Sequence, residues 1–417
     1  MMRATKDSGF EWIGIIPTEW ALSKIGQVYR LRNTKVSDTD YLPLSVTNKG
    51  IVPQLDTAAK TNAHDDRKLV KKGDFAINSR SDRRGSCGIS DFDGSVSLIN
   101  TILAPLNEMN PGYYDWLFHT VQFGDEFYKF GHGIVDDLWT TGWQEMKKIT
   151  IPTPPLPEQQ RIADFLDAKC AEIDALTADI QTQINTLEQY KRSVITETVT
   201  KGLNSNAEMK DSGIQWVGEI PVHWPVHPVY SYYGERKNKN RLGKEDNLLS
   251  LSYGRVIRKD INTNDGLLPE SFNTYNIVEA GDIIIRPTDL QNDKRSLRTG
   301  LVKEHGIITS AYIDLCPLKQ VDSRYFHFLL HAYDVMKVFY NMGNGVRQGL
   351  NYSEFSRLMV FEPPYEEQVA MADYLEIKVT EVDAIIEQKK EQMAVLDAYK
   401  RSLIFEYVTG KKEVPLS

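Results

Sequence analysis

A chain of 417 residues is too long for one ordinary hydrophobic core, which predicts two or three domains. With 41% hydrophobic and 25% charged residues, no run of about 18 apolar residues and no apolar N-terminal stretch, neither a membrane span nor a signal peptide is expected. Three isolated cysteines favour the cytoplasm over a disulfide framework or a zinc site, and the net charge of −8 gives only a weak argument against a nucleic-acid partner.

A short tryptophan-rich motif opens the chain and returns halfway along it. Residues 6–20 read KDSGFEWIGIIPTEW and residues 210–224 read KDSGIQWVGEIPVHW, with nine of fifteen positions identical. We treat residues 1–20 and 204–224 as two copies of one tag. A repeat on this scale indicates that the whole architecture is duplicated.

The region that follows the first tag, residues 21–152, and its counterpart, residues 225–362, are less alike. Both contain a Gly-Asp pair, at residues 73–74 and 281–282, followed by a short apolar run that is typical of a strand. Residues 114–119 and 325–331 have the pattern of short helices. We therefore expect two globular domains of mixed α/β structure with divergent sequences.

Each variable region is followed by a segment that is matched in the other half without a gap. Residues 158–200 align with residues 367–409, and prolines stand shortly before both. Apolar residues recur at spacings of three, four and seven, which is the pattern of a coiled-coil seam. This seam would comprise Leu166, Ile173, Leu176, Ile180, Leu187 and Val194 in the first copy, and Leu375, Val382, Ile386, Met393, Leu396 and Leu403 in the second.

The two segments predict long helices over residues 153–203 and 363–411, ending near Gly202 and Gly410. The simplest arrangement is an antiparallel pair that separates the two α/β domains, with approximate twofold symmetry. The alternative is that each helix packs only on its own domain. If the duplication closes on itself, Met1 and Ser417 should lie close together, and each tag should pack where one helix ends and a domain begins.

A search for catalytic motifs finds none. No GxxxxGK[ST] phosphate loop and no Gly-rich nucleotide loop is present. Residues 362–365, EPPY, are similar to a methyltransferase motif, but Glu stands where that chemistry needs Asp or Asn, and a helix start explains the proline pair better. His327 and His331 share a helical spacing but lack a third metal ligand, so core or surface roles are favoured over a metal site.

Basic residues concentrate in the two variable regions. Residues 65–90 contain seven Lys or Arg against four Asp, and residues 235–260 contain eight against four acidic residues. The first long helix is acidic, with eight acidic and five basic residues over 158–201. Such local clusters are what phosphate neutralisation requires, and Arg, Asn and Gln side chains can read base edges. The alternative is that these are solvated loops.

The clusters and polar loops give a set of candidate DNA-binding residues. They are Lys71, Lys72, Asn78, Arg80, Arg83, Arg84 and His132 in the first half, and Arg236, Lys237, Arg255, Arg258, Arg286, Lys294, Arg295, Arg298, Asn344, Arg347 and Gln348 in the second. No catalytic residue and no metal ligand is expected.

The tag KDSGxxWxGxIPxxW, the helix start PPLPEQQRIADFLD, the helix end YKRSVITETVTKG and the duplicated layout resemble the specificity subunits of type I restriction–modification systems. The resemblance covers essentially the whole chain. It implies two target recognition domains, each of which reads one half of a bipartite sequence in double-stranded DNA, and long helices that act as spacer and docking surface.

The resemblance also implies the partners. Two modification (methyltransferase) subunits would dock on the helices, and restriction (endonuclease and translocase) subunits would join that core in the cytoplasm. S-adenosylmethionine, ATP and Mg would bind in those partners, and this chain would need no cofactor. Two alternatives remain open: a coiled-coil scaffold with two protein-binding modules, and a stand-alone methyltransferase or nuclease.

Overall fold

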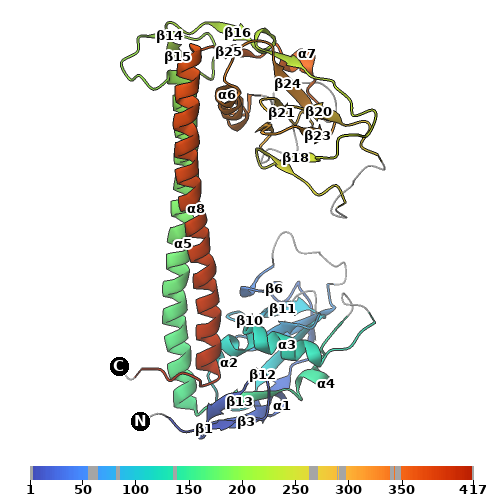
Figure 1. Cartoon of the computed structure of the whole chain (residues 1–417). Coiled ribbons are helices and arrows are strands. Elements are labelled where there is room, and N and C mark those ends of the chain that lie inside the picture. Colours follow the sequence, from blue (N-terminus) through green and yellow to red (C-terminus); the bar gives the residue numbers. More distant parts are fainter. Residues whose placement is uncertain are drawn as a thin grey trace. The chain divides into compact units, whose positions relative to one another are not determined.

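The computed structural model describes residues 3–54, 64–80, 85–134, 139–262, 271–288, 290, 297–338, 342 and 349–415. The chain divides into two compact units (Figure 1). Unit 1 comprises Met1–Ile180 with Lys390–Ser417, and unit 2 comprises Gln181–Lys389. The boundary passes through both long helices, so each unit contains one tag, one α/β domain and a stretch of each helix.

Unit 1 contains a mixture of short strands and helices. The strands are β1 (Thr5–Asp7), β2 (Ile15–Pro17), β3 (Ala21–Lys24), β4 (Tyr29–Leu31), β5 (Lys35–Val36), β6 (Leu44–Thr47), β7 (Gly50–Pro53), β8 (Arg67–Val70), β9 (Phe75–Asn78), β10 (Cys87–Ile89), β11 (Gly94–Ser97), β12 (Asn100–Pro105) and β13 (Thr150–Thr153). The short helices are α1 (Ile25–Val28), α2 (Pro111–Phe118), α3 (Val121–Lys129) and α4 (Trp143–Met146).

The domain of unit 1 is built around an antiparallel sheet in the order β10-β9-β12-β4. Alternate residues of a strand point to opposite faces. Phe75 and Ile77 therefore join the core formed with α2, the tag and the long helices, whereas Ala76 packs with Leu44 and Val96 of neighbouring strands. The sheet is thus covered on both faces.

Unit 2 repeats this plan. Its strands are β14 (Met209–Asp211), β15 (Glu219–Pro221), β16 (Val226–Pro228), β17 (Tyr233–Glu235), β18 (Leu249–Ser252), β19 (Arg255–Arg258), β20 (Asn276–Val278), β21 (Ile283–Ile285), β22 (Thr299–Leu301), β23 (Gly306–Ile308), β24 (Ile313–Pro317) and β25 (Met359–Phe361). The helices are η3 (Val229–Ser231), α6 (Ser323–Val335) and α7 (Tyr352–Phe355). The central sheet has the order β17-β24-β21-β22, which corresponds to β4-β12-β9-β10 of unit 1.

The two long helices are α5 (Leu156–Lys201) and α8 (Tyr365–Val408) (Figure 1). They pair antiparallel in each unit. In unit 1 the rings of Phe165 and Tyr407 lie 4.5 Å apart, and Lys400 donates to Asp174 across 2.6 Å. In unit 2 Lys191 donates to Asp383 across 2.6 Å. The predicted pair of long antiparallel helices is confirmed, and the helix ends also pack into the domain cores through residues such as Leu166 and Val199.

One predicted seam position is wrong. Leu176 is 48% exposed, whereas Ile173, Ile180 and Ile184 are buried. In a helix with 3.6 residues per turn, Leu176 is rotated by about 60° from Ile173. The seam therefore follows the 173–180–184 stripe and leaves Leu176 on its flank.

The tags form the joints between helices and domains. In unit 1 the Trp20 indole donates to Glu158 in the first turn of α5 across 2.9 Å, and Gly410, just after α8, adopts a φ of 70° against Pro17 and Trp20. In unit 2 the Trp224 indole donates to Glu367 in the first turn of α8 across 3.0 Å. The predicted packing of each tag at a helix end is confirmed.

The predicted proximity of the chain ends involves residues outside those described. Met1 and Ser417 have no described position. Nearby, however, the Lys411 ammonium donates to the Ile13 carbonyl, and Val414 packs against the core of unit 1. The segment after α8 therefore lies on the first tag, within unit 1.

Candidate nucleic-acid interface

Three candidate residues from two segments of unit 1 meet at the end of β9. Asn78 is the last residue of β9, and its side-chain oxygen accepts the Arg80 amide across 3.0 Å. Arg80 forms an isolated bridge with Thr140, and His132 exchanges two backbone hydrogen bonds with Thr140 of 2.9 and 3.0 Å. Arg80 and His132 are exposed. The polar groups predicted to read base edges are therefore gathered at one edge of the domain.

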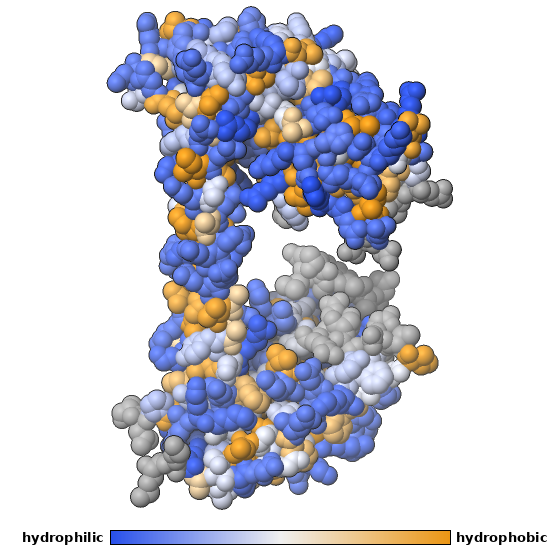
Figure 2. All heavy atoms as spheres, viewed as in Figure 1, coloured by the Kyte–Doolittle hydropathy of each residue, from blue (hydrophilic) through white to orange (hydrophobic). Residues whose placement is uncertain are grey.

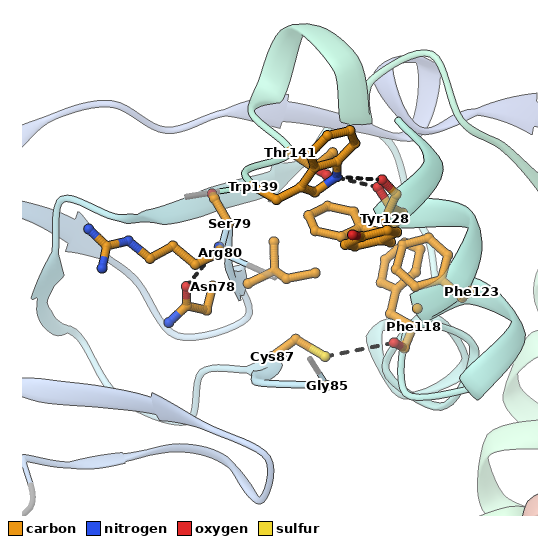
Figure 3. Close-up of a pocket in the computed structure, with 13 residues that line it drawn as sticks. Asn78, Ser79, Arg80, Gly85, Cys87, Phe118, Phe123, Tyr128, Trp139 and Thr141 are labelled. Carbon is orange, nitrogen blue, oxygen red and sulfur yellow. Dashed lines mark hydrogen bonds between the residues drawn. The ribbon is translucent and has the colours of Figure 1, made fainter. Parts of the chain in front are cut away.

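An aromatic cluster lies beside this edge (Figure 3). Trp139 stacks on Tyr128 with ring centroids 5.4 Å apart, and its indole donates to the Tyr128 carbonyl across 3.0 Å. A Cβ on Gly131 would lie 2.3 Å from the Trp139 Nε1, so only glycine permits this approach. The glycine of the Gly131-His132-Gly133 sequence thus fixes the loop that carries His132.

The cavity beside these rings is small. It has a volume of about 30 Å³ and is lined by Asn78, Arg80, Cys87, Phe118 and Trp139 among others. This is room for a water molecule or two and not for a nucleobase, since one water in the liquid occupies roughly 30 Å³. Burial raises the pKa of the Cys87 thiol well above its ordinary value, which keeps it protonated and unreactive. Figure 3 shows the Arg80 side chain directed away from the rings.

Lys71 and Lys72 belong to a different edge of unit 1. They form the turn before β9, where the Lys71 amide donates to Asp74 across 2.8 Å. Asn78 is six positions after Lys72, which corresponds to roughly 20 Å of extended chain. The structure therefore does not bring these lysines to the Asn78–Arg80–His132 edge.

The same turn explains the repeated Gly-Asp pair. The Arg32 guanidinium donates to both oxygens of buried Asp74 across 2.5 and 3.0 Å. Arg236 does the same to Asp282 across 2.8 and 3.0 Å. The hydrogen bond to Asp282 is the main cause that raises the pKa of Arg236. Arg236 was predicted as a DNA contact, but its guanidinium holds the turn before β21 in place.

Three of the predicted residues of unit 2 that the structure describes are exposed and form ion pairs. Arg255 and Arg258 lie on β19 with side chains 73% and 71% exposed, and they pair with Asp383 and Glu304 respectively. Lys237 is also exposed and pairs with Glu235 across 2.8 Å. Arg286 directly follows β21 and corresponds to Asn78, because both backbone amides donate to the segment before the next strand.

Arg298 is a correction to the prediction. It is fully buried at 0% exposure, and its guanidinium donates to the Thr288 carbonyl across 2.6 Å and to the Arg286 carbonyl across 3.4 Å. Its backbone amide donates to Asp334 across 2.5 Å. An arginine enclosed in this way holds the described segment from Arg286 to Thr288 from inside and presents no surface to DNA.

Seven candidates lie outside the described residues. They are Arg83, Arg84, Lys294, Arg295, Asn344, Arg347 and Gln348.

One exposed residue was missed by the sequence analysis. Tyr253 is 90% exposed at the tip of the β18–β19 hairpin, where Ser252 pairs with Arg255 across a two-residue loop. Its φ is 46°, and that of Gly254 is 78°. This left-handed conformation favours Asn or Gly, so a bulky aromatic here is costly for folding. The sequence signal was an aromatic-glycine pair between two strand-like segments in a basic region.

The sequence predicted neither a metal site nor a membrane span. No group of three or more His, Cys, Asp or Glu in the described part of the chain is arranged to hold a metal ion. His327 and His331 pack 6.3 Å apart on α6, and burial is the main cause that lowers their pKa values to about 3 and about 4. None of the helices within the described ranges is both long and apolar enough to span a bilayer.

A family model matches part of the chain. Residues 17–186 match a family model described as Type I restriction modification DNA specificity domain. The predicted resemblance to specificity subunits of type I restriction–modification systems is confirmed.

Two curated relatives come from Methanocaldococcus jannaschii. The chain is 25% identical over 276 residues to a putative type I restriction enzyme MjaX specificity subunit, and the match covers 65% of this chain and 61% of that protein. It is 25% identical over 351 residues to the type I restriction enzyme MjaVIII specificity subunit, covering 78% and 76%. The chain thus matches somewhat less than two thirds of the MjaX relative's length.

Solved structures share the fold. One is a chain from a structure described as the structural basis underlying complex assembly and conformational transition of the type I R-M system, with a TM-score of 0.72, 13% identity and coverage of 95% and 99% of the two chains. Another is the HsdS subunit from Thermoanaerobacter tengcongensis, with a TM-score of 0.54, 14% identity and coverage of 97% and 100%. At these identities the similarity concerns the fold.

Proposed function

We propose that this chain is the DNA-reading subunit of a type I restriction–modification complex, in which each α/β domain reads one half of a bipartite target in double-stranded DNA. The observation that carries this proposal is the duplicated edge at the end of the central strand. Asn78, at the end of β9 in unit 1, and Arg286, directly after β21 in unit 2, occupy equivalent positions but differ in chemistry. Amide and guanidinium groups pair with different bases in the major groove.

The long helices would serve as spacer and as docking surface for two modification subunits. Continuous helices of 46 and 44 residues are each roughly 65–70 Å long at 1.5 Å per residue. Figure 2 shows hydrophobic residues at their surface. Exposed apolar side chains include Leu176, Val395 and Tyr399 in unit 1, and Tyr190, Ile377 and Ile385 in unit 2. Such side chains suit a protein partner.

Catalysis would belong to the partners. S-adenosylmethionine would bind in the modification subunits, and ATP and Mg in the restriction subunits, so that this chain acts without a cofactor. The motif search in the sequence supports this division of labour, since no phosphate loop or methyltransferase motif was found.

Methylome sequencing of cells that carry all three subunits tests the proposal. We expect methylation at one bipartite target, and exchange of residues 41–148 for those of another family member should change one half-site only. Changes in both half-sites would contradict modular reading. The DNA-reading proposal predicts salt-dependent DNA binding by the assembled complex. A coiled-coil scaffold that binds only proteins would lack it. Methylation by the purified chain alone would instead support a stand-alone enzyme.

A second experiment tests the spacer. Inserting residues in helical register between Ile173 and Leu187, with a matched insertion in α8, should lengthen the unread gap and leave both half-sites unchanged. An unchanged gap would show that the helices do not set the spacing.

A further inference from the structure

Unit 1 contains an arginine that is enclosed by a tag and the start of a long helix. Arg3 donates from Nη1 and Nη2 to the two carboxylate oxygens of Glu158 across 2.6 and 2.7 Å, and from Nε to Glu19 across 2.6 Å. Its guanidinium carbon lies 5.7 Å from the centre of the Trp20 ring. The side chain of Arg3 is only 18% exposed. A two-oxygen fork and an aromatic face are the features that distinguish arginine binding from lysine binding.

Unit 2 has the same framework without the arginine. Trp224 is fully buried, and its indole donates to Glu367 as that of Trp20 donates to Glu158. The tags align with an offset of 204 residues, as Lys6 and Lys210 show, which places Ala207 at the position of Arg3. The long helices align with an offset of 209, which places Ala370 at the position of Arg161. Two large cationic side chains are thus replaced by methyl groups at one place.

The replacement leaves a cavity of about 230 Å³ beside Glu367. This is room for several water molecules, since each occupies roughly 30 Å³ in the liquid. The lining residues comprise the two alanines, the Glu367 carboxylate, His223 and the end of α5 with the segment after it. Lys201 also lines the cavity, and its ammonium nitrogen lies 3.9 Å from a carboxylate oxygen of Glu197. The cavity therefore combines space with a carboxylate that is 42% exposed.

His223 contacts one oxygen of the Glu367 carboxylate. It stands at the position of Glu19, and its ring nitrogen lies 2.8 Å from Oε1 of Glu367. Its side chain is 50% exposed, so rotation toward solvent frees the oxygen that Arg3 Nη1 uses in unit 1. The other oxygen keeps the Trp224 indole, as in unit 1.

We propose that this cavity of unit 2 binds the guanidinium of an arginine side chain from another protein, in the way that unit 1 binds its own Arg3. The occupant is external because Ala207 stands where the chain would otherwise supply its own arginine. The guanidinium enters beside Ala207 and Ala370 and forms a fork with Glu367, whose Oε2 also accepts the Trp224 indole, and His223 moves aside. This inference does not depend on DNA reading, since the site and its ligand are both protein groups.

The test follows the indole N–H resonances of Trp224 and Trp20 in the full-length chain by nitrogen-15 NMR, with Nα-acetyl-argininamide as the probe. The Trp224 resonance should shift saturably, and Nα-acetyl-lysinamide at equal concentration should shift it several-fold less. Ala207→Arg fills the cavity from within and should abolish the response, and His223→Ala should strengthen binding.

The wild-type Trp20 resonance is the internal control, because Arg3 already occupies its site. It should not respond, whereas Arg3→Ala should make it responsive. No saturable shift at Trp224, or a shift that persists unchanged in Ala207→Arg, would overturn the proposal. A response at Trp20 in Arg3→Ala without one at Trp224 in the wild type would also overturn it, since the cavity would then be closed by His223.

Discussion

Arg255 on the β18–β19 hairpin donates from Nη2 to Oδ2 of Asp383 on α8 across 2.9 Å. Lys191 of α5 donates to the other oxygen of the same carboxylate across 2.6 Å. A single side chain of unit 2 therefore links the paired helices to a hairpin that carries candidate DNA contacts. Because the Arg255 side chain is 73% exposed, DNA phosphates can compete with Asp383 for it.

Arg255→Ala should weaken DNA binding by the assembled complex about equally for all sequences, and should reduce the slope of log affinity against log salt by about 1, as expected for one lost phosphate contact. The change in unfolding free energy should stay below about 1 kcal/mol, because the ion pair is largely exposed. Arg258 lies on the same strand as Arg255, and Arg258→Ala, which breaks the pair with Glu304, is the matched comparison. A loss confined to one base pair would instead identify Arg255 as a base contact.

Arg80→Ala should reduce discrimination at one half-site by roughly 1–3 kcal/mol, the value of a good base contact. Its side chain is exposed and its backbone is fixed by Asn78 and Thr140, so folding should be unaffected. Competition binding with single-base variants of the target measures the effect. Lys72→Ala is the control at the opposite end of β9, and an equal loss in both variants would argue against a special role for this edge.

Tyr253→Asn should have opposite effects on the stability of unit 2 and on its affinity for DNA. Asn tolerates the left-handed φ of 46° better than Tyr, so unit 2 should gain up to about 1 kcal/mol in stability. If the exposed ring stacks on DNA, affinity should fall by roughly 1–3 kcal/mol. Urea unfolding and DNA binding are measured on the same variant. Tyr253→Phe should retain affinity, and unchanged affinity in Tyr253→Asn would exclude a stacking role.

Asp314 predicts a pH dependence of unit 2. Burial, followed by the charge of Asp282, raises its pKa from 3.8 to about 8. Between pH 3.8 and about 8 the folded state therefore holds a proton that the unfolded state releases. The stability of unit 2 should fall as the pH rises through this window. The slope is at most about 1.4 kcal/mol per pH unit.

Asp314→Asn cannot ionise and should remove this fall, so the variant should be more stable than the wild type at about pH 9. Urea unfolding across the window measures it. Ile102 stands at the equivalent position of β12, so unit 1 provides an internal comparison. Parallel pH curves for Asp314→Asn and the wild type would contradict the assignment.

The large-scale architecture could be predicted because local sequence patterns determine where its helices and domains begin and end. The repeated tags, the prolines before α5 and α8, and the glycines after them mark element boundaries through backbone geometry alone. The Gly-Asp pairs mark the start of a strand in the same way, through the turn that they form. Such features need no knowledge of distant contacts, and the two copies confirm each other.

Individual side chains were predicted less well because their roles depend on tertiary partners. Arg298 and Arg236 look like exposed loop arginines in the sequence. The carbonyls that enclose Arg298 and the Asp282 carboxylate that holds Arg236 come from other segments. Tyr253 was missed for the opposite reason, since an aromatic residue suggests burial until the two-residue loop turns it outward.

The composition of the two units has a consequence for the order of folding. Residues 181–389 form unit 2 without interruption, whereas unit 1 requires residues 390–417. Leu403, Ile404 and Val408 lie in its core, and the Tyr113 hydroxyl donates to the Val408 carbonyl across 2.8 Å. During synthesis the domain that is translated first must therefore wait for residues 390–417, and the second domain can be completed before it. A nonsense mutation near residue 400 would damage the N-terminal domain and leave the C-terminal one intact.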